Sequence, residues 1–204
     1  MAATAGGGLR LAGLGVYRID GVNGVGLALF LPLAELVLVA LAEEAVFRGI
    51  VFGVTERAWG SRAVLAISAL LFALAHLPNE GISVLAVAAA CAFGLLQAAI
   101  YMRTRRLWLC IGGHVAWNYS VGQVSSIPVS GHAVTSGLVR GDLAGAPWLT
   151  GGAFGVEGSL VSLVVIAIAA LAWLRLAFKR PAGRFRHASM NVCSPVKGEH
   201  TNKA

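Results

Sequence analysis

The chain has 204 residues, of which 57% are hydrophobic and 12% are charged. Charged residues make up about 25% of an ordinary soluble domain, and the mean hydropathy here reaches +0.77. The composition therefore excludes a water-soluble globular protein and indicates one embedded in a membrane. The formal net charge of +7 requires no nucleic-acid partner, because membrane topology explains where the basic residues stand.

Taken in chain order, the apolar stretches predict membrane-spanning helices at 27–54, 62–77, 82–102, 107–126 and 158–178. Most of them approach the roughly 20 residues that a helix needs to cross a bilayer. Helices are expected because an irregular backbone cannot leave its amides unpaired in lipid. The predicted fold is all-α, a polytopic transmembrane helical bundle of about five spans, within a range of roughly four to six.

The segments around these helices differ in composition. Residues 1–24 are rich in glycine and predict a loose lead-in, residues 25–178 form the helical domain, and residues 179–204 form a polar basic tail. We expect the tail to be mostly disordered, because it has little apolar surface to bury. The connection from 127 to 157 is too apolar and too long for a simple turn, which suggests a partly ordered or re-entrant segment.

The basic residues indicate which side of the membrane faces the cytoplasm. With five spans, one side carries two loops and the C-terminal end, with Arg57, Arg62, Arg103, Arg105, Arg106, Arg175, Lys179 and the basic residues of the tail. The opposite side carries only Arg10, Arg18 and Arg140. By the positive-inside rule, we expect a multi-pass membrane protein whose basic loops and tail are cytoplasmic and whose surface contacts lipid.

The stretch EEAVFR places three charged residues inside the first predicted span. Glu44 and Arg48 stand four residues apart with the acid first, which is the favourable order for an ion pair on a helix. Glu43 points about 100° away around the helix axis, so it is left to act as a proton acceptor. All three could instead join helices without any chemistry, but ionisable residues inside a membrane are functional candidates by default.

Two further polar pairs have helical spacing. FALAH puts Phe72 and His76 on one face of the second predicted helix, and HVAWN puts His114 and Asn118 on one face of the fourth. Either histidine alone could be a core residue that donates to a backbone carbonyl. We measured depth along each predicted helix from the arginine-rich edge of the membrane, at about 1.5 Å per residue. By this measure, these groups and Glu43 lie at similar depths. We therefore expect them to surround one polar site.

In this order, EEAVFR, FALAH and HVAWN resemble the EExxxR, FxxxH and HxxxN motifs of the CPBP family (CAAX protease and bacteriocin-processing, or Abi). These intramembrane endopeptidases include type II CAAX prenyl endopeptidases and lysostaphin-resistance-protein-A-like proteins. The resemblance covers about residues 25 to 178. It also includes GGAFGVEGS, which is similar to the family's segment before its last helix.

The resemblance implies a role for each motif residue. Glu43 and His76 would activate a water molecule for attack on a peptide carbonyl, while His114 and Asn118 would hold the oxyanion. The remaining two motif residues, Glu44 and Arg48, would support the first helix. The implied activity is that of a CAAX-type intramembrane endopeptidase, a hydrolase that cleaves a membrane-associated protein or peptide, whether prenylated or not.

The sequence leaves metal dependence open. Members of the family are often labelled metalloproteases, and Glu43, His76 and His114 would be the ligands of zinc or another divalent metal. However, the chain has no HExxH spacing, and Asn118 suits an oxyanion better than zinc. We favour a mechanism that requires no cofactor.

Two other classes of function remain open. A non-catalytic membrane scaffold, such as a bacteriocin-immunity or regulatory protein, could use the same fold, although it would not need both histidines and Asn118. A small transporter could use Glu43 and the histidines as a proton relay, but it would be expected to show inverted repeats, which we do not find in the sequence. Outside the motifs, Glu157 is expected to stabilise a helix N-terminus and Gln97 to join two helices.

Overall fold

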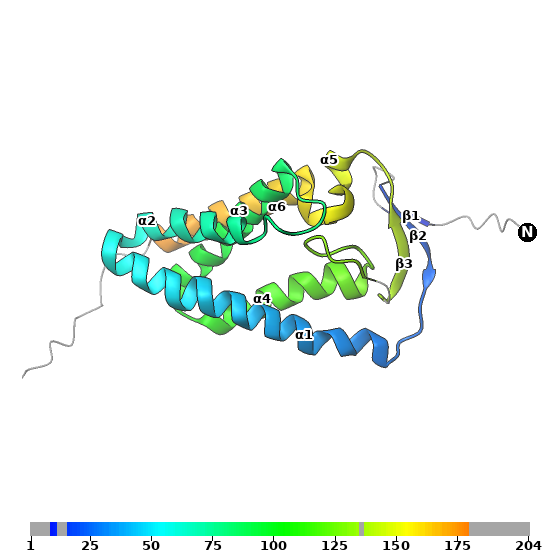
Figure 1. Cartoon of the computed structure of the whole chain (residues 1–204), viewed down its shortest axis with the longest axis horizontal. Coiled ribbons are helices and arrows are strands. Elements are labelled where there is room, and N and C mark those ends of the chain that lie inside the picture. The colour runs from blue at the N-terminus through cyan, green and yellow to red at the C-terminus, as the bar shows by residue number, and fades with distance from the viewer. Residues whose placement is uncertain (1–8, 12–15, 135–136, 180–204) are drawn as a thin grey trace, which may run out of the picture.

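A computed structural model of the chain describes residues 9–11, 16–134 and 137–179, and the predicted tail beyond Lys179 lies outside this range. The protein is mostly helical (Figure 1). Its longer helices are α1 (Leu27–Glu44), α2 (Phe52–Ala75), α3 (Val84–Thr104), α4 (Leu107–Tyr119) and α6 (Leu160–Phe178). Shorter helical pieces are η1 (Ala45–Val51), η2 (Ser120–Val124), α5 (Pro147–Thr150), η3 (Gly152–Phe154) and η4 (Val156–Gly158). Helices thus occupy most of each stretch that was predicted to be helical, and several of the predicted ends differ by one or two residues.

The first two predicted helices meet at a corner formed by Gly60. From Leu27 to Trp59 the chain is continuously helical, and α2 then changes direction at Gly60, whose φ of 80° lies in the left-handed region. Only glycine adopts this conformation readily. The later part of α2 therefore runs back from the corner, which lies at the left end of Figure 1, and packs on η1, where the Phe72 and Phe47 ring centroids are 5.2 Å apart.

A three-stranded antiparallel sheet closes the opposite end of the bundle. Its order is β1 (Leu9–Leu11), β2 (Tyr17–Val22) and β3 (Val139–Leu143). The register places Tyr17 opposite Leu143 and Val22 opposite Val139, with a bulge between Ile19 and Gly21. The sheet corrects an all-α expectation and the expectation that residues 1–24 are loose throughout.

The sheet was not predicted, because its two outer strands, β1 and β3, are far apart in the sequence. Side chains along β2 alternate between the protein interior and solvent: Tyr17 and Ile19 are partly buried, and Arg18 and Asp20 are exposed. Its partner β3 comes from the 127–157 connection, which is partly ordered as expected. Additional hydrogen bonds hold β2 and the residue after it in place: Tyr17 donates to the Ser125 carbonyl directly after η2, and Asn23 Nδ2 donates to the Gly137 carbonyl of the connection at 2.7 Å.

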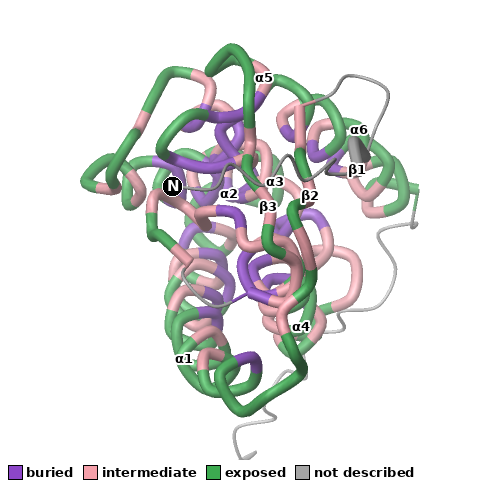
Figure 2. Tube along the Cα trace, turned by 90° about the vertical axis from the view of Figure 1, so that its right-hand side faces the viewer, coloured by how far each residue is buried: buried purple, intermediate pink, exposed green. Residues whose placement is uncertain are grey.

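The helices form two groups that share a polar interior. α3 lies between α2 and α6, and α1 lies along α4. At Gly94 the backbones of α3 and α2 approach closely, because a Cβ atom there would stand 3.0 Å from Phe72 Cβ and 3.1 Å from Ala69 Cα. Small residues permit this kind of contact between helices in membranes. Buried segments gather between the helices, while the outer surfaces are largely exposed (Figure 2).

The outward-facing residues are apolar rather than charged. Among the described helices, α3 and α6 are long and apolar enough to cross a membrane, with mean hydropathies of 2.1 and 2.4. Only 17% of the α6 window is buried, so most of its apolar side chains face outward. A large exposed apolar face is unfavourable in water but suits the hydrocarbon of a bilayer.

Candidate active site

Glu44 is the centre of a buried network that joins four helical elements. Its Oε1 atom accepts hydrogen bonds from His114 Nδ1 at 3.0 Å, Arg48 Nη1 at 3.1 Å and Gln97 Nε2 at 3.3 Å. The donors come from α4, η1 and α3, and all four residues are buried. Three donors on one oxygen require an acceptor with no proton of its own. Glu44 Oε1 is therefore the shared acceptor that joins the end of α1 to α4, η1 and α3.

The ion pair predicted between Glu44 and Arg48 is confirmed. Arg48 is completely buried and uses its other terminal nitrogen to donate to the Gly94 carbonyl at 3.0 Å. Its Cζ atom also lies 4.9 Å from the centre of the Phe72 ring, a cation–π distance. Arg48 thus fastens the first helix to α2 and α3.

Two of the motif segments adjoin a π-helix. One, η1, begins directly after Glu44, and the other, η2, begins directly after Tyr119, next to Asn118. π-Helical turns are rare and occur frequently at functional sites. They were not predicted, because the apolar periodicity of these stretches is equally compatible with a regular α-helix.

The hydrogen bonds of the two histidines determine which ring nitrogen carries a proton. His76 Nδ1 lies 2.8 Å from the Phe72 carbonyl, which can only accept, so Nδ1 is the donor and Nε2 of neutral His76 is an acceptor. By the same argument, His114 Nδ1 donates to Glu44. His114 Nε2 lies 3.9 Å from Glu43 Oε2, too far for a direct hydrogen bond.

His76, His114 and Asn118 all lie on the wall of one partly open cavity of about 30 Å³. The cavity is lined by Phe72, His76, Ala89, Ala90, Phe93, His114, Trp117, Asn118, Ser130, Phe154, Glu157 and Ile166. A single water needs roughly 10–15 Å³ of such space and several polar partners. The cavity therefore has room for one or two waters beside the predicted residues.

The structure does not bring every predicted residue to this cavity. Glu43 is not part of its lining, and no contact among the described residues joins Glu43 to His76. Instead, Glu43 approaches His114 from the side. Its Oε2 atom is buried and accepts no hydrogen bond within the described part of the chain. This oxygen is thus available as a proton acceptor.

Two residues of the cavity wall, Ser130 and Glu157, were not predicted to belong to the site. Glu157 Oε1 accepts from Trp117 Nε1 at 2.5 Å, and Oε2 accepts from the backbone nitrogen and hydroxyl of Ser130 at 2.6 and 2.9 Å. Glu157 was expected to stabilise the N-terminus of the last helix. Ser159 caps that helix, α6, by accepting from Ser162 N, and the hydrogen bonds of Glu157 go to Trp117 and Ser130 instead. The one available signal was an acid inside the apolar stretch GGAFGVEGS.

The arrangement does not form a metal site. Among residues 9–11, 16–134 and 137–179, no three His, Cys, Asp or Glu side chains lie close enough together to hold an ion. Catalytic zinc normally takes three protein ligands, and the set Glu43, His76 and His114 does not converge in this way. We therefore derive no chemical step through a metal.

Comparison with known proteins agrees with the motifs. Residues 25–120 match the family model described as type II CAAX prenyl endopeptidase Rce1-like. The match includes EEAVFR, FALAH and HVAWN. No curated protein and no solved structure matches the chain. Because the match ends at Ser120, the placement of Ser130 and Glu157 beside the motifs comes from the structure alone.

Proposed function

We propose that this chain, which belongs to the type II CAAX prenyl endopeptidase Rce1-like family through residues 25–120, is a membrane-embedded endopeptidase. The observation that carries the proposal is the cavity between α2, α3 and α4, where His76, His114 and Asn118 meet beside the Glu44 network. A scaffold has no need for two histidines with fixed tautomers that line one cavity. Proton acceptors and amide donors around a water-sized cavity do suit hydrolysis.

In the proposed reaction, Glu43 takes one proton from a water molecule as the water oxygen attacks a peptide carbonyl, and His76 Nε2 accepts a hydrogen bond from the same water. Glu43 does not line the cavity, so its carboxylate must turn toward the cavity for this step. Asn118 and His114 Nε2 donate to the oxyanion that forms. His114 already gives its Nδ1 proton to Glu44, so it donates from Nε2 only as an imidazolium, which the Glu44 carboxylate stabilises. Collapse of the intermediate breaks the C–N bond, and the proton taken from water passes to the departing amine.

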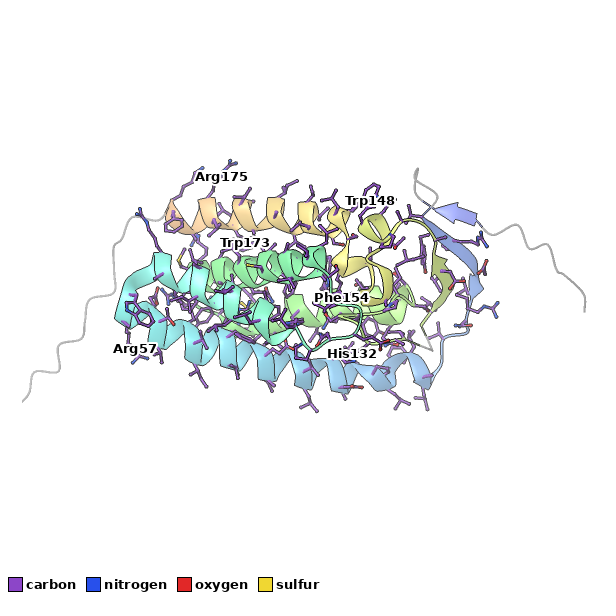
Figure 3. The ribbon with its side chains drawn as sticks, turned by 45° about the horizontal axis from the view of Figure 1, so that its top comes forward. Arg57, His132, Trp148, Phe154, Trp173 and Arg175 are labelled. Atoms are coloured by element: carbon purple, nitrogen blue, oxygen red, sulfur yellow. The ribbon has the colours of Figure 1, made fainter. Side chains whose placement is uncertain are left out.

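The proposed topology has five spans with the basic end in the cytoplasm. Figure 3 places Arg57, Trp173 and Arg175 toward one end of the molecule and Trp148 toward the other. The end with Arg57 and Arg175 also contains the Arg103–Arg106 connection between α3 and α4, while Arg18 and Arg140 lie in the sheet at the opposite end. This asymmetry supports the orientation by the positive-inside rule.

The proposed substrate is a membrane-associated protein or peptide. Much of the cavity wall is aromatic or aliphatic, including Phe72, Phe93, Phe154 and Ile166, so an apolar segment is favoured. Both prenylated and unmodified apolar peptides are candidates.

The test uses purified protein in liposomes with two fluorogenic peptides, one prenylated and one apolar but unmodified. We expect cleavage of at least one peptide by the wild type, no cleavage by Glu43→Gln, and wild-type cleavage by Glu35→Gln. Glu35 is the matched control because it is an exposed α1 glutamate outside the motifs. Activity should also survive exhaustive chelation. Equal cleavage by wild type and Glu43→Gln would contradict the proposal, and a biological activity unaffected by Glu43→Gln would favour the scaffold.

A further inference from the structure

Glu157 is an acidic residue whose carboxylate faces the cavity rather than solvent. It is 9% exposed, and both of its oxygens are occupied: one by Trp117 and the other by the backbone and side chain of Ser130. Burying a charged group is unfavourable unless hydrogen bonds compensate it. Three donors from two separate segments supply that compensation, so Glu157 links η4 to α4 and to the loop after η2.

The contact with Trp117 connects Glu157 to the proposed oxyanion residues. Trp117 immediately precedes Asn118 and follows His114 by three positions on α4, so the direction of its indole depends on the rotation of that helix. Its ring also contacts Phe93 at a centroid distance of 6.3 Å, and Phe93 contacts the His114 ring at 5.2 Å. A change at Trp117 would therefore be transmitted to His114 and Asn118, the other two residues of α4 that line the cavity.

The contact with Ser130 fixes the opposite part of the wall. Ser130 has a φ of 49°, which non-glycine residues adopt uncommonly. Asn79 Nδ2 donates to its carbonyl at 2.9 Å, and the next backbone nitrogen, of Gly131, donates to the Phe154 carbonyl at 3.0 Å. Glu157 binds the remaining polar groups of Ser130. This loop position is thus held from the α2–α3 turn and from the segment before α6.

We infer that Glu157 is a positioning residue, which holds Trp117 and Ser130 and thereby sets the orientation of His114 and Asn118 across the cavity. The geometry requires a carboxylate, because all three neighbours are donors. A glutamine would turn its NH2 group toward Trp117 or toward Ser130 and lose at least one contact. The link to catalysis rests on the proposed endopeptidase function, but the link to His114 does not.

The experiment compares Glu157→Gln and Trp117→Phe with the matched control Ser159→Ala. Ser159 is buried in the same segment and caps α6, but it does not line the cavity. NMR of the protein in nanodiscs would follow the indole N–H of Trp117, assigned from Trp117→Phe, and the Cε1–H of His114. We expect Glu157→Gln to move both signals, Trp117→Phe to move that of His114, and Ser159→Ala to move neither.

Kinetics give the second measurement wherever cleavage is observed. A misplaced oxyanion donor should lower kcat of Glu157→Gln by about 10–100-fold, with KM within about twofold of wild type. Combining Glu157→Gln with Trp117→Phe should add little beyond the larger single effect, since both remove the same contact. Ser159→Ala should keep the wild-type kcat at temperatures where it is folded.

The outcomes separate this inference from the proposed function. An unchanged Trp117 signal in Glu157→Gln, or a moved Trp117 signal with unchanged His114, would overturn the positioning role whether or not cleavage exists. Loss of kcat to the same extent in Ser159→Ala would also overturn it, because general loosening of the segment would then be the cause. If the wild type cleaves nothing, the proposed function fails, while the NMR comparison still decides whether Glu157 positions His114.

Discussion

His114 Nδ1 lies 3.0 Å from Glu44 Oε1, so the second glutamate of EEAVFR orients the histidine of HVAWN. The same oxygen carries the ion pair with Arg48. Glu44 therefore contacts both Arg48, in its own helical segment, and His114, which lies 70 positions later on α4. This double use separates its role from that of Glu43, which makes no ion pair with Arg48 and stands 3.9 Å from His114.

The two glutamates should respond differently to the same substitution. Glu44→Gln leaves the buried Arg48 without its counter-ion, and removing one partner of a buried pair costs about 3–5 kcal/mol of unfolding free energy. Glu43→Gln removes a proton acceptor but no hydrogen bond described here, so its stability should stay close to wild type. Thermal unfolding in detergent measures the difference. Equal midpoints for the two variants would contradict the assignment of separate roles.

A methyl group on Gly94 should destabilise the bundle. The added Cβ would stand 3.0–3.1 Å from Phe72 Cβ and Ala69 Cα, and such overpacking typically costs about 1–3 kcal/mol. Gly112 in α4 is the control, because nothing lies within 4 Å of its added Cβ. Gly112→Ala should be neutral or gain about 0.5–1 kcal/mol from higher helix propensity. A loss of stability no larger for Gly94→Ala than for Gly112→Ala would argue against the close contact of α2 and α3.

The helices and the Glu44–Arg48 pair could be predicted because both depend on local spacing. Apolar runs define where a helix can lie in a membrane, and an acid and a base four residues apart share a face of any helix. The similar depths of His76, His114 and Asn118 along their predicted helices also indicated that the three residues share one site. None of these arguments requires knowledge of which helix packs on which.

The remaining parts of the site depend on contacts between distant segments. Gln97 donates to Glu44 across 53 positions, and Glu157 accepts from Trp117 across 40. Nothing in the local sequence of either residue indicates its partner. The sheet was missed for the same reason, since β2 pairs with a strand more than 100 positions later.

The proposed cytoplasmic end should lose stability in acid through one ion pair. Arg105 donates to both oxygens of Glu56 at 2.6 and 2.7 Å, and these hydrogen bonds hold the pKa of the Glu56 carboxyl below its ordinary value of 4.5. Because the folded pKa is the lower one, the stabilisation is complete above about pH 4.5 and disappears as pH falls through the folded pKa.

Substituting Glu56 tests this pH dependence. The pair is partly exposed, so we expect Glu56→Gln to cost only about 0.5–1 kcal/mol at pH 7. Below the folded pKa, the wild type and the variant should have the same stability. The measurement is the difference in unfolding midpoint between the two proteins at pH 7 and at successively lower pH. A difference that grows as the pH falls would have the wrong sign for this account.

Removing Asn118 should affect turnover more than binding. If its amide donates to the oxyanion, Asn118→Ala should lower kcat by about 10²–10³ with little change in KM. Gln123 provides a control, because it is also a buried amide near the end of the same helical segment but does not line the cavity. Gln123→Ala should retain kcat. A rise in KM at constant kcat in Asn118→Ala would indicate a role in substrate binding instead.

The most direct test of the proposed endopeptidase activity is isotope incorporation during cleavage. Wild-type and Glu43→Gln protein in liposomes would be incubated in ¹⁸O-labelled water with membrane proteins from cells that lack this chain, and new C-termini would be identified by mass spectrometry. The account predicts C-termini in apolar or membrane-associated segments that contain one ¹⁸O atom from the attacking water, and predicts them only with the wild type. The same labelled C-termini with Glu43→Gln, or none with either protein, would contradict it.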